Sequence, residues 1–451
     1  TAGIAGRVQP PDGNHLEESG GDGGMKWEKV KLGKYVEILS GFAFKSKDFL
    51  NCGVPVIKIK NITQEGVTLE DVSYISKELA DKNEKYHLNY NDILIALTGS
   101  HINQMSSVVG RIARIKYHED SLLNQRVGKV FAKDSKLCDI DYVYYFLSQD
   151  YIKISLASKA GGAANQANIS PNDVKSLTVR WPDIETQHRI ADILSAYDDL
   201  IENNQKQIKL LEEAAQRLYK EWFVDLRFPG HENTKIVDGV PEGWSKNPIQ
   251  DFISYEIGGG WGEELQNEKS MIPAYVIRGT DIKGLVNGQL QSVPYRYHTA
   301  GSLETRKLRD GDIVFEVSGG SKTEGVARTV RIIDLMLKTW ENSVICASFC
   351  KRIKPIPSFS QYLYDSFRWM RLNGKTQEYD KKSASSIVNY RWKDFLAQEK
   401  ILKPDEETIS RYNNIAGTIY TKIIVCSCQI EQAKMKRDLL LPKLMNGEVE
   451  V

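Results

Sequence analysis

Several short stretches carry residue types that could do chemistry, yet each lacks a group that the chemistry requires. The segment Gly319-Gly320-Ser321-Lys322-Thr323 is similar to a phosphate-binding loop, but Ser321 stands where that loop needs a glycine directly before the lysine. A base-methylating enzyme needs an Asn/Asp-Pro-Pro-aromatic loop around the flipped base, and the single Pro-Pro pair, Pro10-Pro11, is followed by Asp12. The sequence therefore predicts neither a phosphate loop nor a methyltransferase site.

Metal and nucleophile chemistry is not indicated either. The cysteines form no Cys-x-x-Cys pair and the seven histidines are scattered, so we expect neither a zinc site nor a disulfide framework. Asp183 and Lys209 offer groups of a metal-dependent nuclease, but they lie along one predicted helix with no strand to gather them around a cation. No Ser/His/Asp or Cys/His arrangement stands out. We expect a chain with no catalytic site, metal or cofactor of its own, located in a reducing cytoplasm.

If the partner of the chain is DNA, the residues best suited to contact it are polar and basic residues in loops that follow predicted strands. Arginine, asparagine and glutamine read base edges, whereas lysine, serine and backbone N–H groups bind phosphates. In the first half of the chain we predict DNA contacts from Lys58, Lys60, Asn61, Ser100, His101, Asn103, Gln104, Arg111, Asn165 and Gln166. In the second half we predict them from Arg278, Thr280, Ser318, Ser321, Lys322, Thr323, Lys381, Lys382 and Ser383. The alternative for each is a solvated surface side chain, and we expect Trp261 to pack rather than to stack on a base.

The elements that must position these residues occur twice, because the second half of the chain is similar to the first, displaced by about 220 residues. Residues 91–100 correspond to residues 311–320, and each segment is a turn, an apolar strand and a small polar loop. Gly41 corresponds to Gly258. The sequence therefore predicts an internal duplication.

Within each copy, short strand patterns alternate with helical ones. The strand patterns cover residues 54–60, 92–97, 127–131, 274–278, 312–317 and 344–349, and the helical ones cover residues 141–148 and 360–371. This mixture predicts two α+β blocks, each with a β-rich core.

A long helical pattern follows each copy. From Ile190 to Trp222 apolar residues recur at steps of four and three, interrupted by Asn204, which is typical of a coiled-coil seam. About 38 residues at about 1.5 Å each make a rod of about 55 Å. The second seam begins at Tyr412, and there we expect Pro442 to end or kink the helix. Antiparallel pairing of the rods predicts a dumbbell with a pseudo-twofold axis, a symmetry that suits duplex DNA.

Length and charge are consistent with this organisation. A chain of 451 residues exceeds one hydrophobic core, and no apolar run is long enough to span a membrane. Residues 26–180 carry 22 lysines and arginines against 17 acidic residues, and residues 242–400 carry 23 against 19, so both blocks are mildly basic. Ordinary fluctuation is the alternative explanation. Residues 1–24 are expected to be a disordered leader or a cloning remnant.

Three motifs in this order resemble a known family. They are Gly41-Phe42-Ala43-Phe44-Lys45-Ser46-Lys47-Asp48-Phe49, Gln216-Arg217-Leu218-Tyr219-Lys220-Glu221-Trp222-Phe223-Val224-Asp225, and Arg437-Asp438-Leu439-Leu440-Leu441-Pro442-Lys443-Leu444-Met445-Asn446-Gly447-Glu448. With the duplicated frame, they make the chain similar to specificity subunits of type I restriction-modification systems over residues 25–451. The second copy departs from the family pattern at residues 258–261, so its DNA-facing loop is expected to differ.

The resemblance implies a non-catalytic subunit that reads a bipartite, asymmetric target in double-stranded DNA. It implies a target-recognition domain at residues 25–181, a central helical spacer at 182–228, a second target-recognition domain at 229–402 and a C-terminal helical spacer at 403–451. The helices would dock a pair of methylation subunits, which bind S-adenosylmethionine. Restriction subunits, where present, would use ATP and Mg. The alternatives are a coiled-coil scaffold without sequence-specific DNA binding and an unrecognised DNA-modification enzyme.

Overall fold

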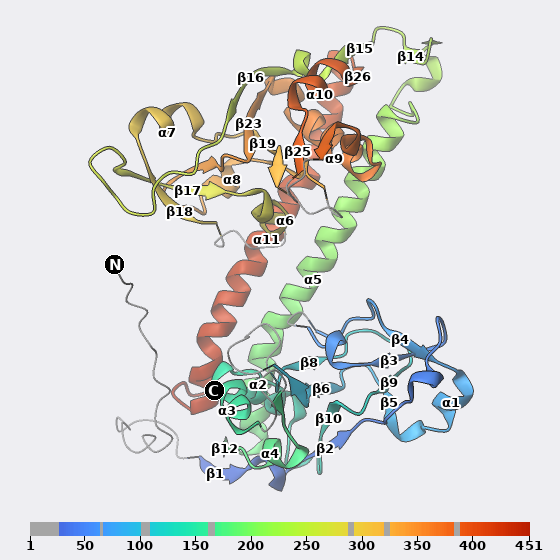
Figure 1. The fold of residues 1–451 in the computed structure, drawn as a ribbon, viewed down its shortest axis with the longest axis vertical. Helices are drawn as coiled ribbons and strands as arrows, with labels where there is room; N and C mark the ends of the chain where they lie inside the picture. The colour runs from blue at the N-terminus through green and yellow to red at the C-terminus, as the bar shows by residue number, and fades with distance from the viewer. Residues whose placement is uncertain are drawn as a thin grey trace. The chain divides into compact units, whose positions relative to one another are not determined.

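The structure is a computed structural model that describes residues 27–63, 66–100, 109–160, 167–286, 293–319, 325–382 and 388–451. The chain forms two compact units. Unit 1 comprises Thr1–Tyr197 with Lys436–Val451, and unit 2 comprises Asp198–Met435. Both units mix helices and strands, as the sequence predicts (Figure 1). The predicted leader, residues 1–24, lies outside the described residues.

Unit 1 is built on a four-stranded antiparallel sheet in the order β2-β10-β6-β8. Every residue of the inner strand β6 is buried, as expected where both faces of a sheet are covered. Helices α2, α3 and α4 contribute buried residues to the core of this sheet. The bounds are β2 (Val36–Ser40), β6 (Ile93–Ala96), β8 (Ile112–Arg114), β10 (Val127–Ala132), α2 (Ile140–Ser148), α3 (Asp150–Lys159) and α4 (Pro171–Lys175).

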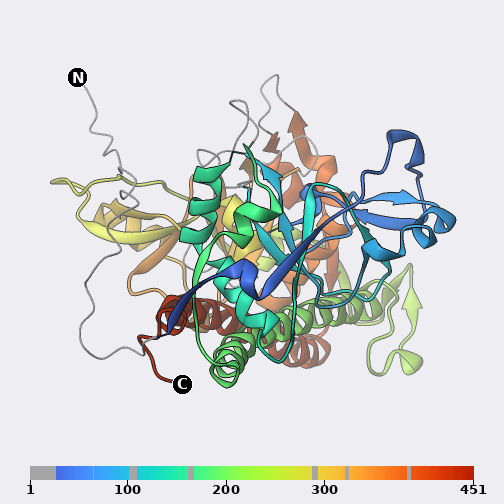
Figure 2. The same cartoon turned by 90° about the horizontal axis from the view of Figure 1, so that it is seen from below.

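A second sheet of unit 1 has the order β4-β3-β9-β5, in which β3 and β9 are parallel. In both views it lies on the side of the central sheet away from α2 and α3 (Figure 1 and Figure 2). Two short pairs, β1 with β12 and β7 with β11, complete the unit. The bounds are β1 (Glu28–Lys31), β3 (Val54–Ile57), β4 (Ser73–Ile75), α1 (Lys77–Asp81), β5 (His87–Leu88), β7 (Thr98–Gly99), β9 (Ser121–Leu123), β11 (Ala167–Asn168) and β12 (Thr178–Trp181).

Unit 2 contains a four-stranded antiparallel sheet in the order β16-β23-β19-β21 and a three-stranded sheet in the order β18-β17-β22. In the latter, β17 and β22 are parallel. The bounds are β16 (Ile253–Gly258), β17 (Ile272–Ile277), β18 (Tyr295–His298), β19 (Ile313–Glu316), β21 (Thr329–Arg331), β22 (Ser343–Cys346) and β23 (Cys350–Pro355). The inner strand β19 is buried throughout, like β6 of unit 1.

Smaller elements close unit 2. A three-stranded sheet has the order β20-β25-β24, and β13 pairs with β14 and β15 with β26. The bounds are β13 (Ile236–Val237), β14 (Val240–Pro241), β15 (Ser245–Pro248), α6 (Ile282–Val286), α7 (Ala300–Arg306), β20 (Ser318–Gly319), α8 (Asp334–Leu337), α9 (Ser360–Leu372), β24 (Asp380–Lys382), β25 (Val388–Tyr390), α10 (Trp392–Gln398) and β26 (Lys400–Lys403). Each of the six predicted strands and both predicted block helices overlaps an observed element, so these predictions are confirmed.

Two helices are far longer than the rest: α5 (Ile184–Phe223) and α11 (Glu406–Asn446). Each begins with the same cap, because Asp183 accepts hydrogen bonds from the backbone and hydroxyl of Thr186, and Asp405 accepts the same pair from Thr408. Within unit 1, Leu194 of α5 and Leu444 of α11 belong to one apolar core. Apolar packing on one face therefore stabilises both helices.

Within unit 2 the two long helices run antiparallel. The thiol of Cys426 lies 3.9 Å from Oε1 of Gln207, and the rings of Tyr412 and Trp222 are 5.7 Å apart. Partner numbers on α11 fall as those on α5 rise. Asn204, at the centre of the predicted seam, is buried.

Of the two expected effects of Pro442, an end of the helix is wrong, because α11 continues through this residue to Asn446. A proline inside a helix removes one backbone hydrogen bond. Leu444 and Met445, just beyond it, are buried in the core of unit 1, and Nη1 of Arg180 donates to the carbonyl of Asn446 at 3.2 Å. These tertiary contacts hold the last turn in place.

Candidate nucleic-acid interface

Strand pairing defines which positions of the two units correspond. In unit 1, β6 lies between β8 and β10, and in unit 2, β19 lies between β21 and β23. Ile93 of β6 pairs with Arg114, and Ile313 of β19 pairs with Arg331. Counting along these strands matches each position of unit 1 with one of unit 2, so the two candidate interfaces can be compared directly.

The strand ends that lead into the candidate loops are held by the same contact in both units. The hydroxyl of Thr98 donates to Oδ1 of Asn168 at 2.8 Å, and the hydroxyl of Ser318 donates to Oδ1 of Asn389 at 2.8 Å. Both hydroxyl-bearing residues are buried. The Ser318 hydroxyl therefore fixes the strand end, and its predicted contact with DNA stays a prediction.

A single 3-10 turn follows β3 and β17: η3 (Ile59–Asn61) and η8 (Gly279–Asp281). Each turn is closed by its last side chain, since Oδ1 of Asn61 accepts from the backbone N–H of Lys58 at 3.1 Å and Oδ2 of Asp281 accepts from that of Arg278 at 2.8 Å. Asn61 is 1% exposed, and its amide also donates to the carbonyl of Glu70. The side chain of Asn61 therefore closes the turn, and its predicted contact with DNA stays a prediction.

Each turn is preceded by an anchored cation. Nζ of Lys58 donates to the hydroxyl of Ser73 at 2.9 Å and lies 3.6 Å from the centre of the Phe49 ring. Burial, with a smaller effect of Lys60, lowers the pKa of Lys58. Arg278 donates from Nε and Nη2 to Asp281, and this hydrogen bonding raises the pKa of the guanidinium.

Exposed polar side chains surround these anchored groups. Lys60 and Thr280, at corresponding positions in the two turns, are exposed, and so is Lys381 on β24. The side chain of Arg278 remains 42% exposed although Asp281 binds it. Positively charged groups held in place at a surface suit phosphate or base-edge contacts.

The two units differ at the end of the central strand. Arg111 donates from Nη1 to the carbonyl of Ile62 at 3.1 Å, and burial lowers its pKa. The corresponding Arg328 instead donates to the buried carboxylate of Glu316, with Nε–Oε2 at 2.8 Å and Nη2–Oε1 at 2.6 Å. Glu316 corresponds to Ala96 of unit 1, so only one unit carries an acid here.

A hollow of about 470 Å³ in unit 2 opens beside this ion pair, and we call it the unit 2 pocket. It contains both apolar and polar side chains, including three of the predicted DNA contacts. Its lining residues are Trp261, Arg278, Gly279, Thr280, Glu316, Ser318, Gly319, Ala347, Ser348 and Phe349. Phe349 is 60% exposed and Trp261 is 39% exposed.

Trp261, which is expected to pack rather than to stack on a base, is flanked by glycines and partly exposed. The guanidinium of Arg296 lies 4.9 Å from the centre of its ring, which leaves part of the indole open to a partner. Pairing also corrects the predicted match of Gly41 with Gly258, because Gly41 donates to Val127 and its counterpart Gly259 donates to Cys350. The one-residue shift arises from an irregularity in β16 between Ile253 and Tyr255.

About half of the predicted DNA contacts can be placed. Lys58, Lys60, Asn61, Ser100, Arg111, Arg278, Thr280, Ser318 and Lys381 are described, and they lie at turns and strand ends of their own unit except for Lys381, which lies within β24. The side chain of Lys382 and the residues His101, Asn103, Gln104, Asn165, Gln166, Ser321, Lys322, Thr323 and Ser383 lie outside the described part of the chain. Their contacts with DNA stay predictions.

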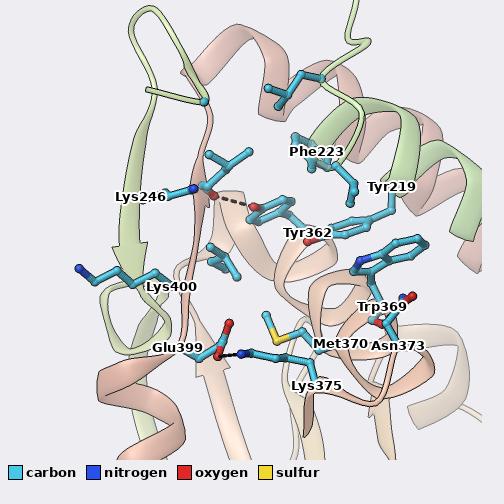
Figure 3. A pocket seen from close by; sticks show the side chains of 15 residues that line it. Tyr219, Phe223, Lys246, Tyr362, Trp369, Met370, Asn373, Lys375, Glu399 and Lys400 are labelled. Carbon is cyan, nitrogen blue, oxygen red and sulfur yellow. Dashed lines mark hydrogen bonds and ion pairs between the residues drawn. The ribbon is translucent and has the colours of Figure 1, made fainter. Parts of the chain in front are cut away.

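A second hollow of unit 2, of about 370 Å³, is lined by residues of the sequence motif at 216–225 (Figure 3). Tyr219 and Phe223 of α5 line it together with Tyr362 of α9. The hydroxyl of Tyr219 donates to Ser366 at 3.1 Å, and that of Tyr362 donates to the carbonyl of Leu402 at 2.5 Å. These aromatic residues attach α5 to the core of unit 2, so the motif at residues 216–225 has a structural function.

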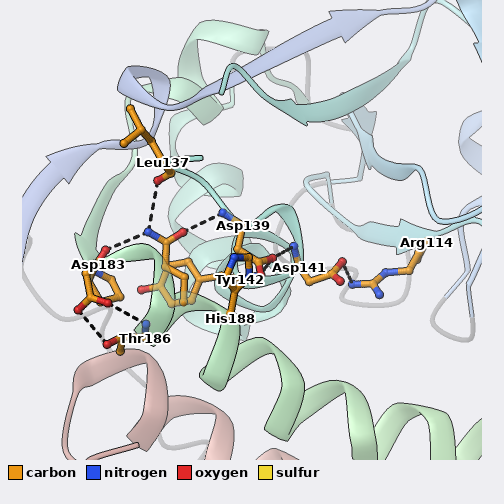
Figure 4. Close-up of polar contacts among 10 residues, drawn as sticks. Arg114, Leu137, Asp139, Asp141, Tyr142, Asp183, Thr186 and His188 are labelled. Atoms are coloured by element: carbon orange, nitrogen blue, oxygen red, sulfur yellow. Dashed lines mark hydrogen bonds and ion pairs between the residues drawn. The ribbon is translucent and has the colours of Figure 1, made fainter. Parts of the chain in front are cut away.

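The junction of α5 with α2 in unit 1 is a polar network (Figure 4). Asp139 caps α2 by accepting from the backbone of Asp141 at 2.7 Å, and its second oxygen contacts Nδ1 of His188. Gln187 accepts from the backbone of Asp139 at 2.9 Å and donates to the carbonyl of Pro182 at 2.9 Å. Since these groups satisfy one another, we assign them to helix positioning.

Within the described ranges, no group of three or more His, Cys, Asp or Glu residues could hold a metal ion. Asp183, which we considered for a nuclease site, caps α5 instead. Among the same residues, no helix is both long and apolar enough to cross a membrane.

Sequence reasoning missed Glu316, Arg328 and Phe349. Glu316 is the one acidic residue in an otherwise apolar strand, at the position where the first copy has Ala96. A charge in a buried strand is costly unless it is paired, so this substitution between the copies was an available signal. Arg328 could be recognised only through strand pairing.

Comparisons with known proteins agree on one family. Residues 25–213 match the family model described as type I restriction modification DNA specificity domain. The chain is 41% identical over 372 residues to the HindI specificity subunit of Haemophilus influenzae, covering 66% of this chain and 74% of that protein. It is also 26% identical over 440 residues to the MjaIX specificity subunit of Methanocaldococcus jannaschii, covering 94% of both.

A solved structure shares the fold. The S subunit of the type I restriction-modification system from M. genitalium matches with a TM-score of 0.59 at 15% identity, covering 93% of this chain and 96% of that one. At this identity the match concerns the fold alone.

Proposed function

The chain belongs to the family of type I restriction-modification DNA specificity subunits, and from this premise we propose that each unit reads one half of a bipartite, asymmetric DNA target. One observation carries the proposal: both units place a capped 3-10 turn with a preceding basic side chain, Lys58 or Arg278, next to a central sheet. Two readers of the same build but different side chains suit a target with two different halves. Residues 25–181 and 229–402 are the recognition domains in this proposal.

Internal duplication is the origin that we propose for the two readers. The corresponding ion pairs support it, since Asp92 binds Lys129 at 2.6 Å in unit 1 and Asp312 binds Arg352 at 2.8 Å in unit 2. So do the identical helix caps at Thr186 and Thr408. A shared set of contacts at matched positions is expected of two copies of one ancestral fold.

For the helices we propose the role of a spacer. Residues 182–228 and 403–451 would form an antiparallel coiled coil that separates the recognition domains in a pseudo-twofold dumbbell. The antiparallel contacts of Gln207 and Trp222 within unit 2 support this. At about 1.5 Å per residue, a helix of some 40 residues is about 60 Å long, which corresponds to one to two turns of DNA at about 34–36 Å each.

The helices would also dock a pair of methylation subunits, which bind S-adenosylmethionine and carry out the chemistry. Restriction subunits, where present, would add ATP- and Mg-dependent cleavage. The chain itself would supply the address and no catalytic group, and it would act in the cytoplasm, where its DNA target lies.

Methylome mapping of cells tests the proposal. The chain is expressed with its methylation subunit in cells without other methyltransferases, and a second strain carries a version in which residues 25–181 come from another family member. We expect a split motif in the first strain and a change in only one half of it in the second. A change in both halves, or in neither, contradicts modular reading by the two units.

A matched pair of variants addresses the second half of the target. Ser321→Ala with Lys322→Ala is expected to weaken the half read by unit 2, whereas Lys338→Ala, on the loop after α8, is expected to leave the motif unchanged. If methylation shows no split motif although the partner subunit is soluble and present, the scaffold alternative gains support. Methylation by the purified chain alone would favour the unrecognised enzyme.

A further inference from the structure

The lining of the unit 2 pocket includes the carboxylate of Glu316, which the neighbouring backbone leaves room for. Glu316 is 2% exposed, and both its oxygens accept from Arg328. An added Cβ at position 279 would lie 2.2 Å from Oε1 of Glu316, closer than any real contact. Gly279 is therefore required for this carboxylate to occupy its place.

The corresponding site of unit 1 shows what the frame does without the acid. There Ala96 replaces Glu316 and Ile59 replaces Gly279, as the pairings of β6 with β10 and of β3 with β9 establish. Arg111, the counterpart of Arg328, donates to a backbone carbonyl instead. Unit 1 thus has a large apolar side chain where unit 2 has a glycine, and a small apolar side chain where unit 2 has the acid. The frame of unit 1 therefore forms without this ion pair.

The chemistry of the pocket selects its ligand. A carboxylate only accepts hydrogen bonds, so it repels a phosphate and favours a group rich in N–H donors. Arg328 binds both oxygens, but each carboxylate oxygen can accept more than one hydrogen bond, and Glu316 lines the pocket. The exposed rings of Trp261 and Phe349 belong to the same lining and add apolar surface beside the carboxylate.

Resting on the proposed function, we propose that Glu316 reads the exocyclic N4 amino group of a cytosine in the half of the target recognised by unit 2. In the major groove the N4 donor of cytosine has an acceptor on one side only, O6 of the paired guanine, whereas the N6 donor of adenine lies between N7 and O4 of the paired thymine, and a carboxylate is repelled by both. Thr280 and Arg278, on the turn that lines the pocket, are placed to bind the adjacent groups. Glu316 is thus a specificity-determining residue, held in position by Arg328 and Gly279.

The test uses a double variant that copies unit 1 into unit 2, Gly279→Ile with Glu316→Ala. It removes the carboxylate and refills its space, and Arg328 can then adopt the backbone contact that Arg111 makes in unit 1. The complex with its methylation subunits is titrated with the DNA target found by methylome mapping. In one series of duplexes each cytosine is replaced singly by pyrimidin-2-one, which lacks the amino group.

We expect the wild-type complex to bind about 10- to 100-fold more weakly when one particular cytosine of the second half is replaced. The double variant is expected to bind that duplex and the unmodified one equally. The same replacement in the spacer between the half-sites measures the effect of a weakened base pair alone.

The outcomes separate the two proposals. If the wild type binds a split target but no replacement in the second half matters, or if the sensitivity persists in the double variant, Glu316 does not read cytosine. If the wild type shows no preference for any target, the proposed function itself fails. A uniform loss of affinity for all duplexes, with the sensitivity retained, would assign Glu316 a merely structural role.

Discussion

Units 1 and 2 use the same frame to present different polar groups. The frame is common to both, since an acid at the start of the central strand binds a cation on the neighbouring strand, through Asp92 and Lys129 in unit 1 and Asp312 and Arg352 in unit 2. Behind the 3-10 turns η3 and η8 the units diverge. Unit 1 has Ala96 there, whereas unit 2 places the Glu316 carboxylate beside a pocket.

This difference teaches where specificity can change without loss of the fold. Contacts that hold strand ends and turns are kept, because losing them costs stability in either unit. Positions at the pocket differ in pairs whose sizes compensate. Unit 1 combines the large Ile59 with the small Ala96, and unit 2 combines Gly279 with the larger Glu316. The two units can therefore diverge at these positions while their frames remain the same.

The largest expected effect comes from the two glycines that both frames share. An added Cβ at Gly41 would lie 2.3 Å from the carbonyl oxygen of Asn124, and one at Gly259 would lie 2.1 Å from that of Ala347. Since backbone must shift in each case, Gly41→Ala and Gly259→Ala should each lower the free energy of unfolding by about 4 kcal/mol or more. Denaturant unfolding of the full chain measures this, with hydrogen exchange to identify the affected unit.

Gly417→Ala is the matched control for both variants. This helical glycine of α11 has nothing within 4 Å of an added Cβ, so alanine should stabilise by about 0.5–1 kcal/mol. If Gly41→Ala or Gly259→Ala behaves like the control, the shared steric role of the two glycines is wrong.

The shared ion pair should matter more in unit 2 than in unit 1. The side chains of Arg352 and Asp312 are 6% and 2% exposed, against 20% and 17% for Lys129 and Asp92. Arg352→Met leaves a buried carboxylate uncompensated and should cost about 3–5 kcal/mol, whereas Lys129→Met should cost about 1 kcal/mol. Unfolding of the two variants under the same conditions measures the difference.

Adding Asp312→Asn to Arg352→Met provides the control for this interpretation. Removing the second charge should restore part of the loss, because the unpaired buried carboxylate is its main cause. If Arg352→Met and Lys129→Met lower the free energy of unfolding equally, then burial of the ion pair does not set the size of the loss.

At one pair of matching helix positions, unit 2 has a buried acid and unit 1 has a tyrosine, so we expect only the stability of unit 2 to depend on pH there. Burial raises the pKa of Asp365 to about 6, and its place corresponds to Tyr145 of unit 1, since Tyr142 and Tyr362 make equivalent hydrogen bonds. The raised pKa means that the folded chain binds this proton more tightly than the unfolded chain. The contribution of Asp365 to stability is therefore largest below about pH 4 and is lost as pH rises through 6.

Asp365→Asn should accordingly stabilise unit 2 by about 1–3 kcal/mol at pH 7 and have little effect at pH 4. The asparagine oxygen can still accept from the hydroxyl of Tyr412, which lies 2.7 Å from Oδ2 in the wild type. Thermal unfolding between pH 4 and pH 7 measures the change. A variant that is less stable than the wild type at pH 7 would show that the ionised carboxylate is needed by its donors.

The sequence predicts regular elements well because their periods are local. The seam from Ile190 to Trp222 follows α5, and the predicted strands overlap observed ones within a few residues. What it missed depends on contacts between distant segments. The helix does not end at Pro442, because α11 is held by the core of unit 1. The match of Gly41 is displaced by an irregularity in β16 that no local pattern reveals.

The candidate site was harder to predict than the fold for the same reason. Loop position and side-chain type identified Arg278 and Thr280, which line the unit 2 pocket. Loop position and side-chain type could not show that the Asn61 side chain closes its own turn, or that Arg328 binds Glu316. Those facts follow from strand pairing, which brings together residues far apart in the sequence.

The smallest effect concerns the two long helices, where Asn204 of α5 occupies the seam position that Cys426 occupies on α11. Asn204 is 2% exposed, and among the described residues its Nδ2 group has no hydrogen-bond partner. Asn204→Cys should therefore raise the free energy of unfolding by about 1 kcal/mol, whereas the reciprocal Cys426→Asn should lower it by a similar amount. Urea midpoints at unchanged slope measure both.

If Asn204→Cys instead destabilises the chain, the amide is satisfied in solution and contributes to the helix pair. If it stabilises the chain but broadens the spacing between the two halves of the methylated target, Asn204 keeps the helices in one register at a cost in stability, as a single polar seam residue does in coiled coils. The two readouts thus separate the stability of the helix pair from the spacing of the two target halves, which the proposed spacer role connects to these helices.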